Sequence, residues 1–542
     1  MGYQLSPLRG WRCSIRLGSL MDQQISSYEQ ERREKREKLR ALGLDPSGGR
    51  TENVQPLAQI KALHKPEMGQ DGGPVVTAAG RVMLKRDMGK LSFLTLRDET
   101  GDLQVAIDRK RVDDNAWQVR DLTDLGDLIT VTGPLGTTKK GEVTVWATSV
   151  AMASKALLPP PSKWEGLSDV ELRYRQRYVD LWANPQVMAT LKLRIRIVQE
   201  VRRFMDERGF VEVETPMMQP LAGGAAARPF KTHHNALDIP LFLRIAPELY
   251  LKRLLVGGFT KVYELNRNVR NEGISPRHNP EFTMIEAYEA FGSWETMADL
   301  VESMVCHIAQ NVFGGLTIEH KNAEGQVTRT INLARPWRRV RMTELVEERT
   351  GWKFDKRTLS EANPTLYDAL RSASVDQVRQ ATTTVLPGNQ EETLRQVMAN
   401  KALHFSGKSP AEQLVEVYEK LIEPTLIDPC FVTHVPSVAI PLARESKDDP
   451  FFADVYELAI NGVEISPGYT ELNDPDVQER HFAHQVGDKE EQQKFDEDFI
   501  SALKYGMPPA GGMGMGIDRL VMMLTGAESI RDVILFPLMR PT

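Results

Sequence analysis

The chain has 542 residues, of which 41% are hydrophobic and 26% charged, a composition typical of a globular protein with roughly three or four structural units. Its net charge of -6 excludes bulk positive charge as the basis of nucleic-acid binding, which would have to rest on local basic patches. The three cysteines have no metal-ligand spacing and no apolar run approaches the roughly 20 residues that span a bilayer, so we expect a cytoplasmic protein without a membrane partner.

The amino-terminal region is rich in bases. Residues 1–20 hold three arginines and no acid, a pattern compatible with a targeting segment, although we favour a disordered extension or an effective start at Met21. Residues 28–42 predict a charged helix, because pairs such as Glu31 and Lys35 have the i,i+4 spacing of helical ion pairs. This helix presents either a solvated face or an RNA contact.

A series of short strands follows. Alternation and β-branched residues mark the runs 75–83, 90–98, 103–108, 128–135 and 142–150. Short strands in so small a span predict a closed or partly open barrel, most simply an OB-fold. Such barrels bind single-stranded nucleic acid with stacked aromatic rings and polar side chains, for which Arg81, Phe93 and Gln104 are candidates. A core aromatic with surface polar residues is the alternative interpretation.

Helical patterns resume after a proline-rich spacer at residues 158–162. Residues 170–182 predict one helix with a basic face, and residues 191–208 a long amphipathic helix that ends at Gly209. Residues 210–216 predict a strand.

The next features are a loop of small residues and a carboxylate at a helix start. Residues 223–230 allow a substrate to approach the backbone, and Glu248 begins the helix of a strand–turn–helix unit over 243–255. A carboxylate in that position also fits simple stabilisation of the helix dipole. Residues 292–430 show a mostly helical pattern without recognisable chemistry.

Residues 261–289 predict two strands joined by a basic loop, which contains Arg277 and His278. Alternation places Glu264, Asn266, Asn268, Arg270 and Glu272 on one face of the first strand, and Phe282, Met284, Glu286 and Tyr288 on one face of the second. A cationic loop above a strand-borne arginine suits a nucleoside triphosphate or an RNA end. A solvated edge hairpin would explain the charges but not the two aromatic rings.

Residues 455–471 predict a second hairpin, because Asn461-Gly462 separates two alternating runs. The expected register pairs Ile460 with Val463, Ala459 with Glu464 and Glu457 with Ser466. Glu457 and Glu464 then lie on one face about 7–8 Å apart, where their repulsion favours a shared Mg²⁺. A surface hairpin remains the alternative for either acid alone.

Residues 511–516 form a glycine-rich strand, and Arg519 lies in the first turn of the apolar helix that follows. The glycines belong to no β-α-β pattern and the chain has no GxxxxGK[ST] loop, so phosphates must be held by arginines and metal.

These motifs together resemble the class II aminoacyl-tRNA synthetases and, within them, the bacterial-type lysyl-tRNA synthetases. Residues 204–220 are similar to motif 1, 261–289 to motif 2 and 511–540 to motif 3, and 223–238 are characteristic of the lysyl enzymes. The resemblance covers about residue 72 to the end. It implies an α+β fold, in which an antiparallel sheet flanked by helices forms the catalytic domain and an OB-fold barrel reads the anticodon.

The same resemblance implies a division of the chain and a homodimer formed through motif 1. The units are an extension with its charged helix (1–60), the barrel (72–158), a linker (159–183) and the catalytic domain (184–542) with a helical insertion at about 360–425. The expected partners are ATP, L-lysine and tRNA(Lys), and the expected cofactor is Mg²⁺. A tRNA-binding relative without activity and an aspartyl or asparaginyl synthetase are the alternatives.

Roles carried over by position complete the expectation. Arg270 and Arg519, the catalytic pair, clamp the α- and γ-phosphates, and ATP is also bound by Glu272, His278, Phe282 and Glu457. The metal is bound by Glu457 and Glu464, and the lysine pocket is lined by Glu248, Glu286, Tyr288, Tyr469 and Glu471. The anticodon is contacted by Arg81, Phe93 and Gln104. One residue departs from the family pattern: Pro467 stands where the bacterial lysyl enzymes usually carry an asparagine, two residues before the pocket aromatic. Its side chain cannot donate the expected hydrogen bond to the amino acid, and the backbone before Tyr469 or a water is the alternative donor.

Overall fold

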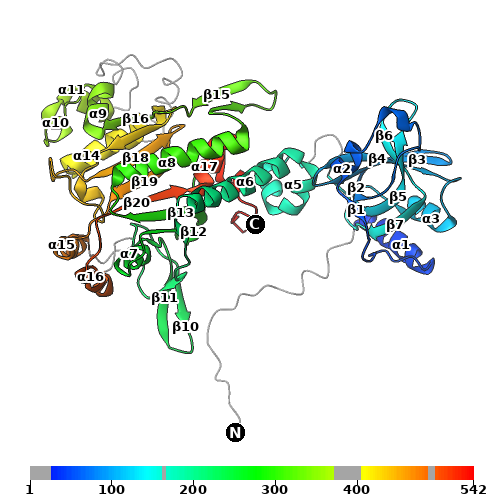
Figure 1. Ribbon diagram of the computed structural model, residues 1–542, viewed down its shortest axis with the longest axis horizontal. Coiled ribbons are helices and arrows are strands. Elements are labelled where there is room, and N and C mark those ends of the chain that lie inside the picture. The colour runs from blue at the N-terminus through cyan, green and yellow to red at the C-terminus, as the bar shows by residue number, and fades with distance from the viewer. Residues whose placement is uncertain (1–25, 162–166, 372–404, 486–494, 542) are drawn as a thin grey trace, which may run out of the picture. The chain divides into compact units, whose positions relative to one another are not determined.

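A computed structural model describes residues 26–161, 167–371, 405–485 and 495–541. The chain divides into two compact units, one up to Met188 and one from Ala189 onward. The first unit is coloured blue to cyan and the second green to red (Figure 1). The predictions for residues 1–20 and for the middle of the insertion fall outside the described residues.

The first unit contains the expected barrel. Its strands are β1 (Val54–Gln55), β2 (Val75–Met88), β3 (Leu91–Asp98), β4 (Gly101–Asp108), β5 (Leu128–Thr137), β6 (Val143–Trp146) and β7 (Ser149–Ser154). They pair in the order β1-β2-β3-β4-β6-β5-β7, and additional pairing between β2 and β5 closes the barrel. The prediction of a single strand over 142–150 was wrong. The chain changes partner there, because β6 pairs with β4 and the end of β5, whereas β7 pairs with the start of β5.

Short helices pack on this barrel: α1 (Ser27–Ala41), α2 (Leu57–Ala62), η1 (Pro66–Met68) and α3 (Asp114–Leu122). The predicted charged helix is α1, and its Glu31–Lys35 ion pair is present at 2.8 Å. Leu39 of α1 is fully buried in the barrel core. Arg32 donates hydrogen bonds to the carbonyl oxygens of Leu125 (2.9 Å) and Ala156 (3.1 Å). The inner face of α1 is therefore a packing surface.

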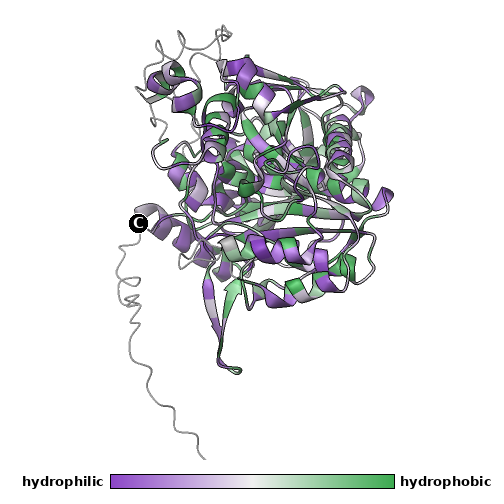
Figure 2. Cartoon of the chain, turned by 90° about the vertical axis from the view of Figure 1, so that its left-hand side faces the viewer, coloured by the Kyte–Doolittle hydropathy of each residue, from purple (hydrophilic) through white to green (hydrophobic). Residues whose placement is uncertain are grey.

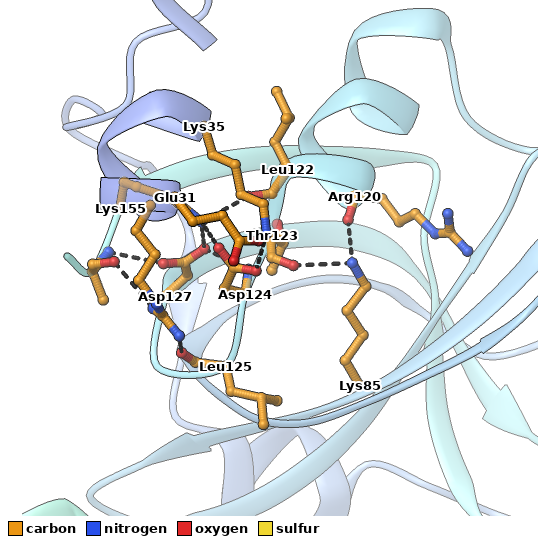
Figure 3. A network of polar contacts seen from close by, with 12 residues as sticks. Glu31, Lys35, Lys85, Arg120, Leu122, Thr123, Asp124, Leu125, Asp127 and Lys155 are labelled. Carbon is orange, nitrogen blue, oxygen red and sulfur yellow. Dashed lines mark hydrogen bonds and ion pairs between the residues drawn. The ribbon is translucent and has the colours of Figure 1, made fainter. Parts of the chain in front are cut away.

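A buried lysine anchors the loop between α3 and β5 (Figure 3). The Lys155 side chain is completely buried, and its ammonium donates to Asp124 (2.6 Å), Asp127 (2.7 Å) and the carbonyl oxygen of Leu122 (2.7 Å). Lys35 of α1 reaches the other oxygen of Asp124 at 2.7 Å. Because burial raises the pKa of Asp127, its charge depends on that ammonium.

The single helix predicted over 170–182 is broken at Gln176 into α4 (Val170–Arg175) and α5 (Arg177–Ala183). Asp180, which is fully buried, binds both Arg173 (3.0 Å) and Arg177 (2.6 Å). Residues seven apart on one continuous helix are separated by about 10.5 Å along its axis. The break brings Arg173 and Asp180 within reach of each other.

The second unit is built on one large sheet. Eight of the described strands pair in the order β16 (Arg338–Arg341), β17 (Cys430–Thr433), β18 (Val455–Ile460), β19 (Val463–Thr470), β20 (Ala510–Gly516), β13 (Glu281–Ala290), β12 (Lys261–Val269) and β8 (Val211–Glu212). The pairs from β17 to β12 are antiparallel. This agrees with the expected antiparallel sheet.

Helices cover both faces of this sheet. A continuous apolar core joins one face to α6 (Pro185–Glu207), α8 (Trp294–Ile308) and α17 (Ile517–Thr525). On the other face, α7 (Glu248–Val256) and α16 (Glu497–Lys504) pack beside β12 and β13. The outer helices alternate between polar and apolar residues, as amphipathic packing requires (Figure 2). The helix α6 begins at Pro185, six residues before its predicted start.

Smaller elements complete the second unit. They are β9 (Met218–Gln219), β10 (Lys231–His234), β11 (Ile239–Leu243), η2 (Ala309–Phe313), β14 (Thr317–Lys321), β15 (Val327–Asn332), α9 (Met342–Thr350), α10 (Leu359–Ala362), α11 (Pro364–Arg371), α14 (Pro410–Val417), η3 (Tyr418–Ile422), η4 (Glu423–Thr425), η5 (Ser437–Ala439), α15 (Pro475–Gln485) and α18 (Ile530–Val533). The mostly helical pattern expected over 292–430 missed β14, β15, β16 and β17. In the part of the chain that the structure describes, no helix combines the length and apolarity needed to cross a bilayer.

We predict that Lys155→Met destabilises the barrel by about 3–5 kcal/mol, because Asp127 would be left buried without its counter-ion. Hydrogen exchange of β5 and β7 measures this local loss. The double variant Lys155→Met/Asp127→Asn should recover part of it, and the exposed Lys140→Met should change little. Equal protection of β5 in the Lys155 variant and the wild type would contradict the assignment.

Candidate functional site

The hairpin β12–β13 forms as predicted and places its polar face as predicted. Glu264 lies opposite Glu286 and Asn268 opposite Phe282, so the polar side chains of both strands share one face. Tyr263 and Ile285 point into the apolar core on the other side. Alternation in the sequence was sufficient to predict which side chains share a face, because no bulge interrupts the pairing of β12 with β13.

One cavity lies above the end of this hairpin. Its lining includes the predicted ATP-site residues Arg270, Glu272, His278, Phe282 and Arg519, together with Arg277, Glu464 and Gly516. The predicted ATP residue Glu457 is not part of this lining. The guanidinium of Arg270 lies 5.1 Å from the ring centre of Phe282. Such a cavity, with cations and an aromatic face, fits a purine nucleotide.

Burial governs the charges in this cavity. It lowers the pKa of Arg270, whose neighbours are Glu272, Glu286 and the cationic Arg519. The Nε atom of Arg270 has no hydrogen-bond partner among the described residues. Burial and Arg519 also lower the pKa of His278. His278 is therefore neutral near pH 7 and offers hydrogen bonds rather than charge.

Arg519 occupies the first turn of α17, as predicted. Its Nη1 donates to the backbone oxygen of Glu464 at 3.0 Å and lies 3.5 Å from a carboxylate oxygen of the same residue. The helix α17 thus ties motif 3 to the second hairpin. The Arg519 side chain remains about one-third exposed.

The hairpin β18–β19 forms around Asn461 and Gly462, which both have positive φ (58° and 70°). Ile460 and Ala459 have the predicted partners, but the predicted pairing of Glu457 with Ser466 was wrong. An irregularity between Leu458 and Ala459 shifts the register by one residue, so Glu457 lies opposite Pro467. A bulge of this kind leaves no signal in an alternating sequence.

Glu457 and Glu464 are nevertheless electrostatic neighbours. Burial and the charge of Glu464 raise the pKa of Glu457 well above its usual value. Among the described residues no three or more His, Cys, Asp or Glu side chains converge in metal-binding geometry. Two carboxylates would hold Mg²⁺ together with phosphate oxygens of a bound nucleotide, because hard oxygen ligands suit this ion.

Sequence analysis missed Glu423, in η4 next to this pair. A carboxylate oxygen of Glu423 accepts a hydrogen bond from the backbone nitrogen of Glu464 at 3.3 Å. Burial, together with Glu464, raises the pKa of Glu423 to about 7. The only local signal is an acid that follows the apolar pair Leu421-Ile422.

A second cavity adjoins the first. The predicted lysine-site residues Glu248, Glu286, Tyr288 and Tyr469 line it, with Gly224, Ala225, Leu442 and Pro467. Arg270, Met284, Pro467 and Gly514 line both cavities. The hydroxyl of Tyr288 donates to Glu286 at 3.2 Å. Burial and the neighbouring charge of Glu248 raise the pKa of Glu286 well above its usual value.

Glu471, the fifth predicted lysine-site residue, lies deeper and is 1% exposed. Its Oε2 is 2.5 Å from the ammonium of Lys252, a residue of α7 that sequence analysis did not single out. A Cβ on Gly512 of β20 would lie 1.9 Å from Glu471 Oε1. The glycine-rich strand therefore leaves the space that this carboxylate occupies.

The three barrel candidates share the outer face of the sheet, but only two lie together. Phe93 and Gln104 come from the neighbouring strands β3 and β4, and Arg86 donates to the side chain of Gln104 at 3.2 Å. Gln104 itself donates to Thr144 at 2.9 Å. Arg81 is held apart from them, because it donates to the backbone of Gly126 (2.7 Å).

Comparison with known proteins agrees with this geometry. Residues 169–540 match the model of the class II tRNA synthetases (D, K and N), and residues 76–152 match that of the OB-fold nucleic acid binding domain. A lysine–tRNA ligase of Carboxydothermus hydrogenoformans is 46% identical over 523 residues, which cover 96% of this chain and 99% of that protein. The lysine–tRNA ligase of Bacillus subtilis is 43% identical over 526 residues, covering 96% and 98%.

The chain belongs to the lysine–tRNA ligase family of class II synthetases. This membership confirms the predicted fold class, with an OB-fold barrel before the catalytic domain. The family model also includes the D and N enzymes, so the full-length relatives decide among the three. Neither the aspartyl or asparaginyl alternative nor a tRNA-binding protein without activity is favoured by these relatives.

We predict that Gly512→Ala destabilises the second unit by about 1–3 kcal/mol, because the new methyl group would overlap Glu471 and the ring of Tyr288. Chemical denaturation measures the free energy of unfolding. Gly516→Ala on the same strand is the matched control, since its nearest atom would be 3.6 Å away. Equal stability of the two variants would contradict the packing described here.

Proposed function

We propose that this chain activates L-lysine with ATP to give lysyl-adenylate and transfers the lysyl group to the 3′ end of tRNA(Lys). One observation carries the proposal: a carboxylate-walled cavity opens beside an arginine-lined cavity, and Arg270 lines both. The carboxylate-walled cavity suits a ligand with ammonium groups, and the arginine-lined cavity suits a triphosphate. Their junction is the place where an amino-acid carboxylate and an α-phosphorus would meet.

In the first step, the lysine carboxylate attacks the α-phosphorus. A bond forms from the carboxylate oxygen to phosphorus, and the bond from phosphorus to the bridging oxygen of pyrophosphate breaks. Arg270, at the junction, stabilises the charge that develops on the α-phosphate oxygens. Arg519 holds the distal phosphates, and stacking on Phe282 positions the adenine. No side chain acts as nucleophile.

Glu457 and Glu464 are the residues that would hold Mg²⁺, with Glu423 behind Glu464. A Mg²⁺ ion held by these carboxylates would supply positive charge to offset the negative charge of the phosphate groups. The carboxylate repulsion described above favours this assignment, because it falls when a cation lies between the two groups.

In the second step, a ribose hydroxyl at the 3′ end of the tRNA attacks the carbonyl carbon of the adenylate. The ester forms, and AMP leaves with the electron pair of the carbon–oxygen bond. We assign recognition of the anticodon to the barrel face that carries Phe93 and Gln104, with Arg81 as a more distant contact. Arg86 beside Gln104 adds a cation to this face.

Specificity for lysine follows from buried acids. Glu286 and Glu471 would be costly to leave beside an uncharged side chain, so neutral amino acids are rejected. Pro467 cannot supply a side-chain hydrogen bond. Pro467 instead forms part of the wall between the two cavities.

We further propose a homodimer and action in the cytoplasm, where tRNA is charged for translation. Ile195 on α6, Val211 on β8 and Met218 on β9 are exposed apolar side chains within or near motif 1. Burial of such a group against a second copy of the chain would stabilise the pair.

ATP–pyrophosphate exchange with each amino acid in turn tests the proposed function. We expect exchange with lysine and none with aspartate or asparagine. Exchange with aspartate would favour a sibling enzyme. Absence of exchange with every amino acid, together with retained tRNA binding, would favour a binding protein without activity.

We predict that Glu471→Gln weakens lysine binding by about 10- to 100-fold, because a buried charge-assisted contact to the ammonium is lost. ATP binding should change by less than about twofold, since Glu471 does not line the nucleotide cavity. Calorimetric titration with each ligand separates the two effects. Equal losses for lysine and ATP would refute this role.

A further inference from the structure

Lys252 is a buried cation behind Glu248, which lines the amino-acid cavity. Its side chain is completely buried, and its ammonium lies 2.8 Å from Glu248 and 2.5 Å from Glu471. It also donates to the carbonyl oxygen of Leu442 at 3.2 Å. An ammonium has three protons, so these three acceptors saturate it.

The carboxylate of Glu471 can accept more hydrogen bonds than it receives. Apart from the Lys252 ion pair, neither of its carboxylate oxygens has a hydrogen-bond donor among the described residues. On its other side the backbone of Gly512 approaches so closely that no side chain fits between them. A buried carboxylate with unused acceptor capacity beside a cavity is arranged to receive a cationic ligand.

The charges that face Glu471 are few. Among the described residues they are Lys252 and Glu248 of α7, and they are accompanied by the hydroxyl groups of Tyr288 on β13 and Tyr469 on β19. Burial raises the pKa of Glu471 to about 7 even though Lys252 acts against the rise. The pKa of Lys252 is itself raised, so the ammonium stays charged. Without Lys252, burial and Glu248 would act on Glu471 unopposed.

Glu248 and Glu286 line the amino-acid cavity together with Arg270, and the Glu471–Lys252 ion pair lies behind this lining. We propose that Lys252 is a positioning residue that keeps Glu471 ionised and oriented for the substrate ammonium. The inference rests on the proposed function, because it assigns lysine to this cavity.

A purely structural role is the competing explanation, since Lys252 also connects α7 to the segment at Leu442. The two explanations differ in pH dependence. If Lys252 acts through Glu471, its removal shifts ionisation of that carboxylate to higher pH, and alkaline solution restores lysine binding. If Lys252 only anchors α7, pH has no such effect.

The test compares wild type and Lys252→Met by calorimetric titration with lysine and, separately, with ATP. At about pH 7 we expect lysine affinity to fall at least about fivefold, because an increase of one unit in the Glu471 pKa from about 7 lowers its ionised fraction from about one half to about one tenth. The deficit should shrink toward about pH 8.5, where free lysine still carries its side-chain charge. ATP affinity should stay within about twofold of wild type.

Lys261→Met is the matched control, because Lys261 pairs with Glu289 at 2.8 Å and lines neither cavity. The double variant Lys252→Met/Glu471→Gln is decisive even where the single variant fails to fold. If Lys252 acts through Glu471, the double variant binds lysine within about twofold of Glu471→Gln alone. A much weaker double variant, or a loss in Lys252→Met that does not depend on pH, would overturn the proposal. A wild-type protein that binds no lysine would instead overturn the proposed function.

Discussion

The catalytic face of the sheet keeps ionised groups away from bulk water, and this constraint governs the rest of the unit. A buried charge is costly unless an opposite charge or a set of donors compensates it. Glu264 meets Arg244 at 2.5 Å, and Glu471 meets Lys252 at the same distance. Arg270, by contrast, has unused donor capacity and lies at the junction of the two cavities. The unused hydrogen-bond donor is therefore found where the ligands are expected.

Both units use the same electrostatic device. In the barrel, Lys155 lies between Asp124 and Asp127 and is covered on every side. In the catalytic unit, Lys252 lies between Glu248 and Glu471, but Glu248 also borders a cavity. The first arrangement is closed and serves stability. The second leaves carboxylate oxygens available, so it serves recognition as well.

The glycine-rich strand β20 makes this arrangement sterically possible. Its backbone pairs with β13 on one side and β19 on the other, and its missing side chains leave room for the Glu471 carboxylate and the Tyr288 ring. Motifs 2 and 3 and the second hairpin are thus adjacent strands of one sheet. Their proximity explains why acids and arginines far apart in sequence line neighbouring cavities.

Local patterns were enough to predict both hairpins, the shared face of Glu264 and Glu286, and the place of Arg519. Alternation, an Asn-Gly turn and a helix start all depend on neighbouring residues. Only the tertiary structure decided the register shift beside Glu457 and the pairing of β16 with β17, since both depend on strands that are distant in sequence. It also decided the role of Lys252. In sequence this is one lysine in an apolar helix; the fold makes it a counter-ion, because Glu471, more than two hundred residues away, is brought to its ammonium.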